Sequence, residues 1–514
     1  MQAADICLLL EGTYPYVRGG VSAWLHQLVR SLHELTFALV FLGGRRMDYG
    51  EPQYALPPNV VHLEAHYLED ALRECPPHRT RLSGRRVREV CALHAELESL
   101  ARAAQAPADP QKPPQAPPSS GALDEVLREL GRDRGLRLAQ FLYSSGAWEI
   151  LCNAYVTRAR ESSFLDYFWT LRLMHAPLFQ LARIADQVPP ARVYHSISTG
   201  YAGFLGAVLQ SRRERPFILS EHGIYTKERR IDLNQTEWFE PTRGEFEPGL
   251  GEPRAELREL WIRYFESLGR IAYRSADPIV ALSEGNRQRQ IADGAPAERV
   301  RIVSNGIDVA AFESALLARP AELPLVVGLI GRVVPIKDVK TFIRAMGAVV
   351  AEIPSAQGWV IGGADEEPAY ARECVALVGA LRLNASVKFL GHQRTAEVLP
   401  KLGVVMLTSV SEGQPLVLLE AFAAGVPCVA TDVGGCRELI EGRDPDDQAL
   451  GRAGRIAPFA DSDALARAAI ELLSSADEWQ ACQVSGLRRV RRCYEQQSMV
   501  DAYRDCYRAA LDKP

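Results

Sequence analysis

Residues 411–420 read SEGQPLVLLE and follow the apolar run VVMLTSV, which is typical of a buried strand. Pro415 suits the first position of a helix, where its missing N–H costs no hydrogen bond, and Gly425 is a typical helix stop. The stretch therefore predicts a strand, a loop and a helix, the repeating unit of a parallel α/β sheet. Glu412 precedes the helix and Glu420 lies more than one turn inside it. They are either a loop acid and a solvated helix acid, or two parts of one ligand site.

Strand-like apolar runs recur along the chain and alternate with helical segments. The N-terminal part contains ICLLLEG, FALVFLGG, RVYHS, FILSEHG and PIVALS, and the C-terminal part contains PLVVGLIGRV, GWVIGG, VKFLGH, VVMLTSV, VPCVATD and GRIAPF. Strands that alternate with helices predict parallel sheets. We therefore expect an α/β protein with two Rossmann-like domains that face each other across a cleft. Ligands of such sheets bind beyond the carboxyl ends of the strands.

The expected domain boundaries follow from breaks in this alternation. Residues 1–315 are predicted to form an N-terminal domain and 316–495 a C-terminal domain, with a helix at 496–514 that packs back on the N-terminal domain. At about 65–190 long runs of Arg, Glu, Leu and Ala replace the strand pattern and predict a helical insertion. The Pro-rich segment at 105–120 predicts an extended loop within it.

Composition argues against several functional classes. A net charge of −5 over 514 residues provides no overall basic field for nucleic acid. The ten cysteines include no CxxC pair, which favours the reduced thiols of a cytoplasm. The N-terminus lacks the basic segment of a signal peptide, and no apolar run approaches the roughly 18 to 20 residues of a membrane span. The absence of HExxH, of a Cys/His cluster and of a GxxxxGK[ST] loop leads us to expect no metal.

Two loops of the C-terminal half carry residues suited to a diphosphate. Arg332 and Lys337 follow the strand PLVVGLIG, and an Arg fork and a Lys point charge can converge on phosphate oxygens. The N–H groups near Leu416 and Val417 would face the same anion with the helix dipole behind them. A carboxylate such as Glu420 accepts two hydroxyl hydrogen bonds, as a sugar diol requires. The alternative for the two cations is a solvated surface.

The N-terminal half offers weaker candidates. Gly19 and Gly20 end the loop after the first strand and would let a ligand approach the backbone, although a lone Gly pair is more often explained by a tight strand-to-helix turn. His222 follows a strand, and a lone His is more often structural than functional. The acidic ADEEP at 364–368 is interpreted as a solvated loop. The basic RRVRR at 488–492 is interpreted as a solvated helix face, with a docking surface as the alternative.

In their order along the chain these motifs resemble a known enzyme family. GTYPYVRGG, SEHG, NGID, GRVVPIK and the E-x7-E pair are together similar to the family 4 retaining glycosyltransferases of the GT-B fold. A closer resemblance, in LLLEGTYPYVRGGVSAW, SEHGIYTKERRIDL and the helical insertion, is to the cytosolic glycosyltransferases of bacterial Pel exopolysaccharide synthesis. The resemblance implies transfer of a hexosyl unit from UDP-glucose or a UDP-N-acetylhexosamine to a growing polysaccharide. It also implies metal independence and work beside an inner-membrane synthase complex.

The resemblance implies roles for individual residues. Arg332 and Lys337 bind the donor diphosphate and stabilise the leaving UDP. Glu420 holds the ribose hydroxyls, and Glu412 contacts the donor sugar. His222 lies by the transferred sugar. The other positions of the expected site are Gly19 and Gly20 near the phosphate and acceptor side, and Gly413, Gln414, Pro415, Leu416 and Val417 at the helix N-terminus.

One departure from the family and two other functions stay open. Gln414 stands where many relatives carry Phe or another apolar residue, which leaves the identity of the donor sugar open. A nucleotide-sugar epimerase would share the two-domain architecture. A non-catalytic UDP-sugar-binding subunit of a synthase complex is the other alternative, although all the expected catalytic positions are filled.

Overall fold

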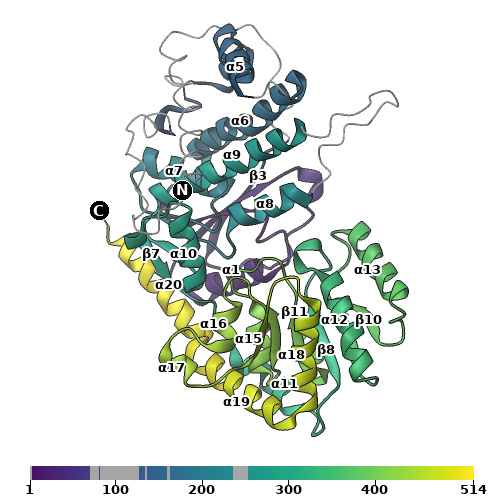
Figure 1. Ribbon diagram of the computed structural model, residues 1–514. Coiled ribbons are helices and arrows are strands. Elements are labelled where there is room, and N and C mark those ends of the chain that lie inside the picture. Colours follow the sequence, from purple (N-terminus) through teal and green to yellow (C-terminus); the bar gives the residue numbers. More distant parts are fainter. Residues whose placement is uncertain are drawn as a thin grey trace. The chain divides into compact units, whose positions relative to one another are not determined.

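The structure is a computed structural model that describes residues 3–69, 80, 127–132, 136–158, 162–235 and 253–513. The chain forms two compact units (Figure 1). The first comprises Met1–Ala281, Arg287–Arg301 and Arg504–Pro514, and the second comprises Leu282–Asn286 and Ile302–Tyr503. Each unit contains one β-sheet, which confirms the prediction of two Rossmann-like α/β domains.

The first unit is built on a seven-stranded sheet with the order β3-β2-β1-β4-β5-β6-β7. Its strands are β1 (Ala4–Glu11), β2 (Phe37–Gly43), β3 (Val60–Tyr67), β4 (Ala191–Ser196), β5 (Phe217–Ser220), β6 (Ile279–Ala281) and β7 (Val300–Ile302). The pairs from β3 through β6 are parallel. The central strands are apolar on both faces because helices cover both sides of such a sheet.

Helices of the first unit pack on this sheet and on one another. They are α1 (Gly20–Ser31), α4 (Leu138–Tyr143), α5 (Ser145–Arg158), α6 (Phe164–Gln187), α7 (Tyr201–Arg213), α8 (Tyr225–Gln235) and α9 (Pro253–Ser275), with short 3-10 turns η1 (Arg46–Asp48) and η3 (Ala297–Arg299). Helix α10 (Glu284–Ala292) starts in the second unit, and its residues from Arg287 onward belong to the first. Helices α6, α7 and α9 lie side by side (Figure 1). Helices α4 to α6 come from the segment predicted to be a helical insertion, while the Pro-rich segment at 105–120 lies outside the described residues.

The second unit has a six-stranded sheet with the order β10-β9-β8-β11-β12-β13. Its strands are β8 (Val326–Ile330), β9 (Gln357–Ile361), β10 (Val387–Gly391), β11 (Val404–Leu407), β12 (Cys428–Thr431) and β13 (Gly454–Ala457). All five neighbouring pairs are parallel. The strand order reverses between β8 and β11, so the loops that follow these two strands meet at the topological switch point, where ligands of such sheets bind.

Helices of the second unit are mostly short and follow the strands. They are α11 (Glu313–Leu317), α12 (Val339–Glu352), α13 (Pro368–Ala380), α14 (Thr395–Val398), α15 (Leu416–Ala423), α16 (Cys436–Glu441), α17 (Pro445–Gln448), α18 (Ser462–Ser474) and α19 (Ala476–Cys493), with the 3-10 turns η4 (Val309–Phe312), η5 (Pro335–Lys337) and η6 (Leu399–Lys401). Helix α20 (Gln496–Leu511) starts in the second unit, and its residues from Arg504 onward belong to the first.

A buried ion pair joins α19 to the segment around α17. Arg489, in the basic run of α19, is fully buried, and its Nε donates to Asp447 Oδ1 at 2.7 Å. Its remaining N–H groups donate to the carbonyls of Leu439, Ile440, Asp447 and Gly451 at 2.7 to 3.3 Å. One member of the predicted solvated face is therefore a core residue, because the helix turns its side chain toward these carbonyls.

The described part of the chain contains neither a membrane-spanning helix nor a metal-binding cluster. No helix there combines the length and the apolar character that a membrane span requires. No group of three or more His, Cys, Asp or Glu side chains in the same residues is arranged to hold a metal ion.

Candidate functional site

The loop after β8 presents Lys337 in a fixed position. The turn η5 ends at Lys337, and Asp338 then adopts a left-handed backbone with φ 45° while its side chain accepts from the N–H of Thr341 and so caps α12. The hydroxyl of Thr408, from the loop after β11, donates to the carbonyls of Lys337 and Asp338 at 2.8 and 3.0 Å. The two loops at the switch point are thus tied together at the base of Lys337.

Lys337 and Glu412 meet between these loops. Lys337 Nζ lies 2.5 Å from Glu412 Oε1, and Ser409 Oγ donates to the same oxygen at 2.6 Å. Their side chains are 23% and 12% exposed, so the ion pair is largely shielded from water. An ammonium group has three N–H donors, and Glu412 takes one of them. The pair therefore holds the Lys337 charge in place and leaves donors for an anionic ligand.

Arg332 is engaged elsewhere. Its Nη1 lies 2.6 Å from both carboxylate oxygens of Glu366, in the acidic ADEEP segment. Both side chains are at least half exposed, and an exposed pair of this kind stabilises a protein by only about 0–1 kcal/mol. Arg332 can exchange Glu366 for another anion at little cost. The sequence predicts a solvated loop at 364–368, and the exposure of Glu366 agrees with it, but the sequence carries no signal of the ion pair with Arg332.

Helix α15 begins one residue later than predicted. Its first residue is Leu416, and Pro415 is the preceding N-cap with ψ 116°, because its ring still suits an extended entry to the helix. The helix ends at Ala423, followed by Gly425 with φ 68°, as the helix stop predicted. The first N–H groups of any helix lack partners within it, so those of Leu416 and Val417 are suited to an anion.

The loop before α15 is locked by two contacts. Gly435 N–H donates to the Gly413 carbonyl at 2.7 Å, and Gly434 adopts φ 52° so close to the backbone that a Cβ there would lie 2.0 Å from the Glu412 carbonyl oxygen. Only glycine fits at that position. This close approach fixes the backbone that carries Glu412.

Gln414 is the second lock of this loop. Its Oε1 accepts from the N–H of Asn305 at 2.6 Å, and Asn305 Nδ2 donates to the Gln414 carbonyl at 3.1 Å. Gln414 is 4% exposed, and its Nε2 is buried without a hydrogen-bond partner among the described residues. Gln414 thus joins the loop before α15 to the SNGID segment, which also belongs to the second unit.

Glu420 lies apart from the Lys337–Glu412 pair in its contacts. It is half-buried on α15. Burial raises the pKa of its carboxyl group to about 7, and a hydrogen bond with the side chain of Thr395 opposes this rise. Thr395 opens α14 after β10, a position that sequence reasoning missed, although the polar run HQRT after the strand VKFLG marks it as a strand-end loop.

The candidates in the first unit surround the start of α1. Gly19 is the N-cap of α1 and Gly20 its first residue, and a Cβ on Gly19 would meet nothing within 4 Å. The ring of His222 packs against Trp24 of α1, with centroids 4.0 Å apart. Its Nε2 is buried and has no hydrogen-bond partner in the described part of the chain. Burial lowers the pKa of His222 to about 3, so the imidazole is neutral at physiological pH.

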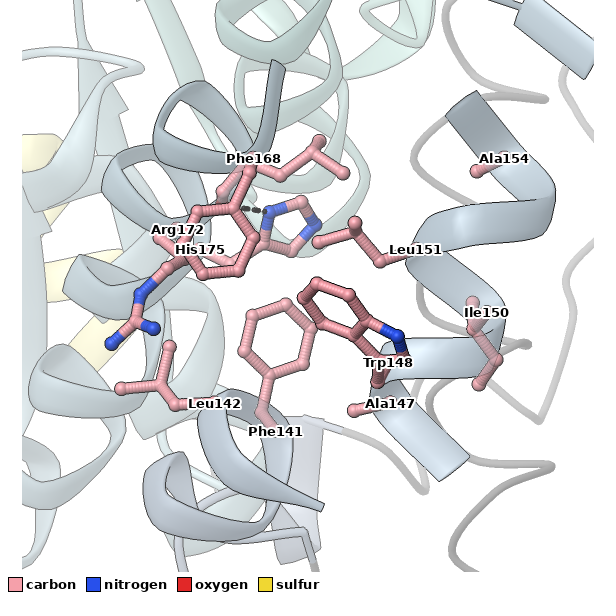
Figure 2. Close-up of a pocket in the computed structure, with 11 residues that line it drawn as sticks. Phe141, Leu142, Ala147, Trp148, Ile150, Leu151, Ala154, Phe168, Arg172 and His175 are labelled. Atoms are coloured by element: carbon pink, nitrogen blue, oxygen red, sulfur yellow. Dashed lines mark hydrogen bonds between the residues drawn. The ribbon is translucent and has the colours of Figure 1, made fainter. Parts of the chain in front are cut away.

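A separate pocket lies among α4, α5 and α6. Figure 2 shows the aromatic rings of Phe141, Trp148 and Phe168 around it, together with Arg172 and His175. The Arg172 guanidinium lies over the Phe168 ring at 5.1 Å, and Phe141 stacks on His175 with centroids 5.1 Å apart. None of the residues predicted from the sequence lines this pocket.

The chain belongs to the family described as domain of unknown function (DUF3492), whose model matches residues 4–298. Residues 324–475 match the model described as glycosyl transferases group 1. This region of the second unit is therefore similar to the group 1 glycosyl transferases.

Curated proteins also match part of the chain. The chain is 30% identical over 250 residues to a D-inositol 3-phosphate glycosyltransferase of Saccharomonospora viridis, which covers 44% of this chain and 54% of that protein. It is 30% identical over 173 residues to an N-acetyl-alpha-D-glucosaminyl L-malate synthase of Bacillus anthracis, covering 34% and 42%. The chain spans about half the length of these relatives.

Structural similarity extends over both units. HepE of Anabaena, solved with UDP and glucose, has a TM-score of 0.56 at 15% identity, covering 98% of this chain and 100% of that chain. Sucrose-phosphate synthase of Thermosynechococcus elongatus has a TM-score of 0.57 at 17% identity, covering 99% and 100%. These similarities show that the fold is that of the GT-B glycosyltransferases.

Proposed function

We propose that the protein is a retaining glycosyltransferase that moves a hexosyl unit from a UDP-sugar to a growing exopolysaccharide. The observation that carries the proposal is the fixed Lys337–Glu412 pair at the switch point of the second sheet, next to the N-terminus of α15. This arrangement aims a shielded positive charge and a helix N-terminus at one place, which suits a diphosphate. The match to the group 1 glycosyltransferases over this unit supports it.

The reaction builds negative charge on the departing diphosphate. Lys337 holds that charge through the N–H donors that Glu412 leaves free, and the first N–H groups of α15 share it. Arg332 adds a second cation after releasing the exposed Glu366. Metal independence is part of the proposal, because these three groups neutralise the leaving UDP. The acceptor hydroxyl gives its proton to the departing phosphate on the same face of the sugar, which retains the configuration.

The remaining residues recognise the donor. Glu420 accepts the ribose hydroxyls, and Glu412 contacts the hydroxyls of the transferred sugar while it holds Lys337. The neutral imidazole of His222 in the first unit hydrogen-bonds a sugar hydroxyl through Nε2, which has no partner among the described residues. Solved structures of HepE contain UDP, UDP-glucose, or UDP with glucose, which supports UDP as the nucleotide.

The proposed biological setting comes from the sequence resemblance. The closer sequence resemblance is to PelF, which favours UDP-glucose, a UDP-N-acetylhexosamine as the next donor, and a cytoplasmic site of action beside an inner-membrane synthase complex. The curated relatives are named for small-molecule acceptors or products, such as inositol 3-phosphate and L-malate. An oligosaccharide acceptor and a small polyol are therefore both included in the test.

The test begins with a calorimetric and thermal-shift screen of UDP-, GDP- and ADP-sugars. A ligand that binds only the folded state at 100 times its Kd stabilises that state by about 2.7 kcal/mol, so the donor raises the melting temperature. UDP release is then measured with and without acceptors. Acceptor-dependent UDP release with retained anomeric configuration is the expected result. Conversion of the donor to its epimer without acceptor, or binding without turnover, would replace transfer by the epimerase or the binding-subunit function.

A further inference from the structure

A buried carboxylate lies directly behind the His222 segment. Glu221 is 1% exposed and accepts four hydrogen bonds. Its Oε2 accepts from Tyr273 Oη at 2.5 Å and from Gln290 Nε2 at 2.9 Å. Its Oε1 accepts from Thr199 Oγ1 at 3.0 Å and from the N–H of Tyr225 at 3.4 Å. All four partners donate, so the network is built for a carboxylate.

The four donors come from four different elements of the first unit. Thr199 follows β4, Tyr225 is the first residue of α8, Tyr273 lies on α9 and Gln290 on α10. Glu221 itself follows β5. One side chain therefore ties the carboxyl ends of neighbouring strands to the helices that leave them. A hydrogen-bond network of this kind fixes the backbone at a strand-to-helix turn more firmly than any single contact would.

Burial and the surrounding hydrogen bonds have opposite effects on the pKa of Glu221. Burial raises the pKa of Glu221 to about 7, the hydrogen bonds from Tyr273, Gln290 and Thr199 oppose this rise, and the Asp293 carboxylate after α10 adds to it. Tyr273 is the titratable group that faces it from α9, and burial keeps the pKa of Tyr273 well above its usual range. Gln290 Oε1 is buried and without a hydrogen-bond partner among the described residues. Rotation of that amide offers an acceptor to a protonated Glu221.

The next residue in the chain is His222. Its ring is held by the Trp24 ring on one side, and its Nε2 has no hydrogen-bond partner in the described residues. The backbone that Glu221 fixes therefore carries the imidazole, and the Trp24 ring packs against it. We propose that Glu221 is a positioning residue: its carboxyl group holds the turn between β5 and α8 so that His222 stays against Trp24. The buried Nε2, which has no partner among the described residues, is thereby kept oriented for a substrate hydroxyl. The identity of the substrate rests on the proposed function, whereas the positioning of His222 by Glu221 does not.

The first readout follows the imidazole itself and needs no substrate. The ring cross-peak of His222, assigned by its loss in His222→Gln, is followed by NMR against pH. In the wild type it does not titrate between pH 8 and pH 5, because the pKa of His222 is lowered to about 3. In Glu221→Ala the ring becomes solvated, and its pKa returns toward the ordinary value of about 6.5. Glu221→Gln keeps the volume and most hydrogen bonds after an amide rotation, so it stays close to the wild type.

The second readout is turnover. Misplacement of a substrate-positioning group by about 1 Å costs on the order of 10²-fold in rate. Glu221→Ala is therefore expected to lower kcat for UDP release by about 10- to 100-fold while the Kd for UDP, set in the second unit, stays within about twofold. Glu221→Gln restores most of the rate and removes the part of the pH profile that Glu221 imposes near pH 7.

The matched control is Tyr194→Phe. Tyr194 is as buried as Glu221 and its hydroxyl accepts from Arg213 at 2.6 Å, but it lies within β4 and has no role in the Glu221 network. It is expected to lose stability without moving the His222 cross-peak. An unmoved cross-peak in Glu221→Ala, or an equal displacement in Tyr194→Phe, overturns the positioning role. If Glu221→Ala does not fold, Thr199→Val removes one donor and is judged by the same criteria. A wild-type protein that releases no UDP refutes the proposed function, while the NMR result still decides the positioning role.

Discussion

Replacement of Lys337 by Met removes the ammonium charge and keeps most of the aliphatic stem. This change is expected to affect both the stability of the fold and the rate of the reaction. In the free protein, Glu412 Oε1 loses the partner at 2.5 Å, and the hydroxyl of Ser409 is the hydrogen-bond partner that remains to it among the described residues. A hydrogen bond to a charged group contributes about 1.5–3 kcal/mol, which sets the expected loss in free energy of unfolding. A typical domain is stable by about 5–15 kcal/mol, so the variant stays folded.

The second consequence concerns the rate. Loss of one preorganised donor to a developing negative charge typically slows a reaction by about 10²–10³-fold, or about 3–4 kcal/mol. The same variant is therefore expected to lose more transition-state stabilisation than free energy of unfolding. Initial rates of UDP release and urea denaturation measure the two quantities separately.

Lys340→Met is the matched control for this experiment. Lys340 lies on the next turn, pairs with Glu373 at 2.6 Å and lies over the Tyr370 ring, with Glu373 60% exposed. Exposed pairs and cation–π contacts of this kind contribute about 1 kcal/mol or less, and Lys340 has no proposed role in the reaction. A Lys337→Met rate within about threefold of the Lys340→Met rate would refute the assignment of Lys337 to the leaving group.

Three further outcomes test other parts of the molecule. Arg489→Ala leaves the buried Asp447 carboxylate uncompensated and is expected to cost about 3–5 kcal/mol in urea denaturation, whereas the pair Arg489→Met with Asp447→Leu should cost less than Arg489→Met alone. The pKa of Glu420 is raised to about 7, and ribose hydroxyls favour its charged form, so UDP affinity is expected to rise as pH increases through 7 with release of a proton. Calorimetry in buffers of different ionisation enthalpy measures that proton, and Glu420→Gln should abolish the pH dependence. Gln414→Ala is expected to weaken donor binding by loosening the contact with Asn305, without changing the ratio of affinities for UDP-glucose and UDP-N-acetylglucosamine; a changed ratio would assign Gln414 to sugar recognition.

The sequence predicted the two α/β sheets because their strands are continuous apolar runs between helical patterns. It also placed Lys337, Glu412 and α15 after strands, where the switch point of the second sheet brings them together. The helix start was wrong by one residue, because Pro415 is compatible with both the N-cap and the first helical turn.

Side-chain contacts between segments far apart in the chain could not be predicted from the sequence pattern. The partners Tyr273 and Gln290 follow Glu221 by 52 and 69 residues, and Glu366 follows Arg332 by 34. Local periodicity specifies which face of an element is buried, but the crossover connections of the sheet decide which side chains meet there. The family resemblance therefore suggests a role for His222, whereas the hydrogen bonds of Glu221 behind it depend on how the chain folds.

The Arg489 contacts have a consequence for the order in which the second unit is completed during synthesis. Arg489 leaves the ribosome 42 residues after Asp447 and 50 residues after Leu439. Until it arrives, the nascent segment from α16 to α17 carries a carboxylate and carbonyl groups without the guanidinium that they surround in the finished structure. We expect this segment to remain open to proteases on stalled chains that end before α19, and to close only when the last helices of the unit are added.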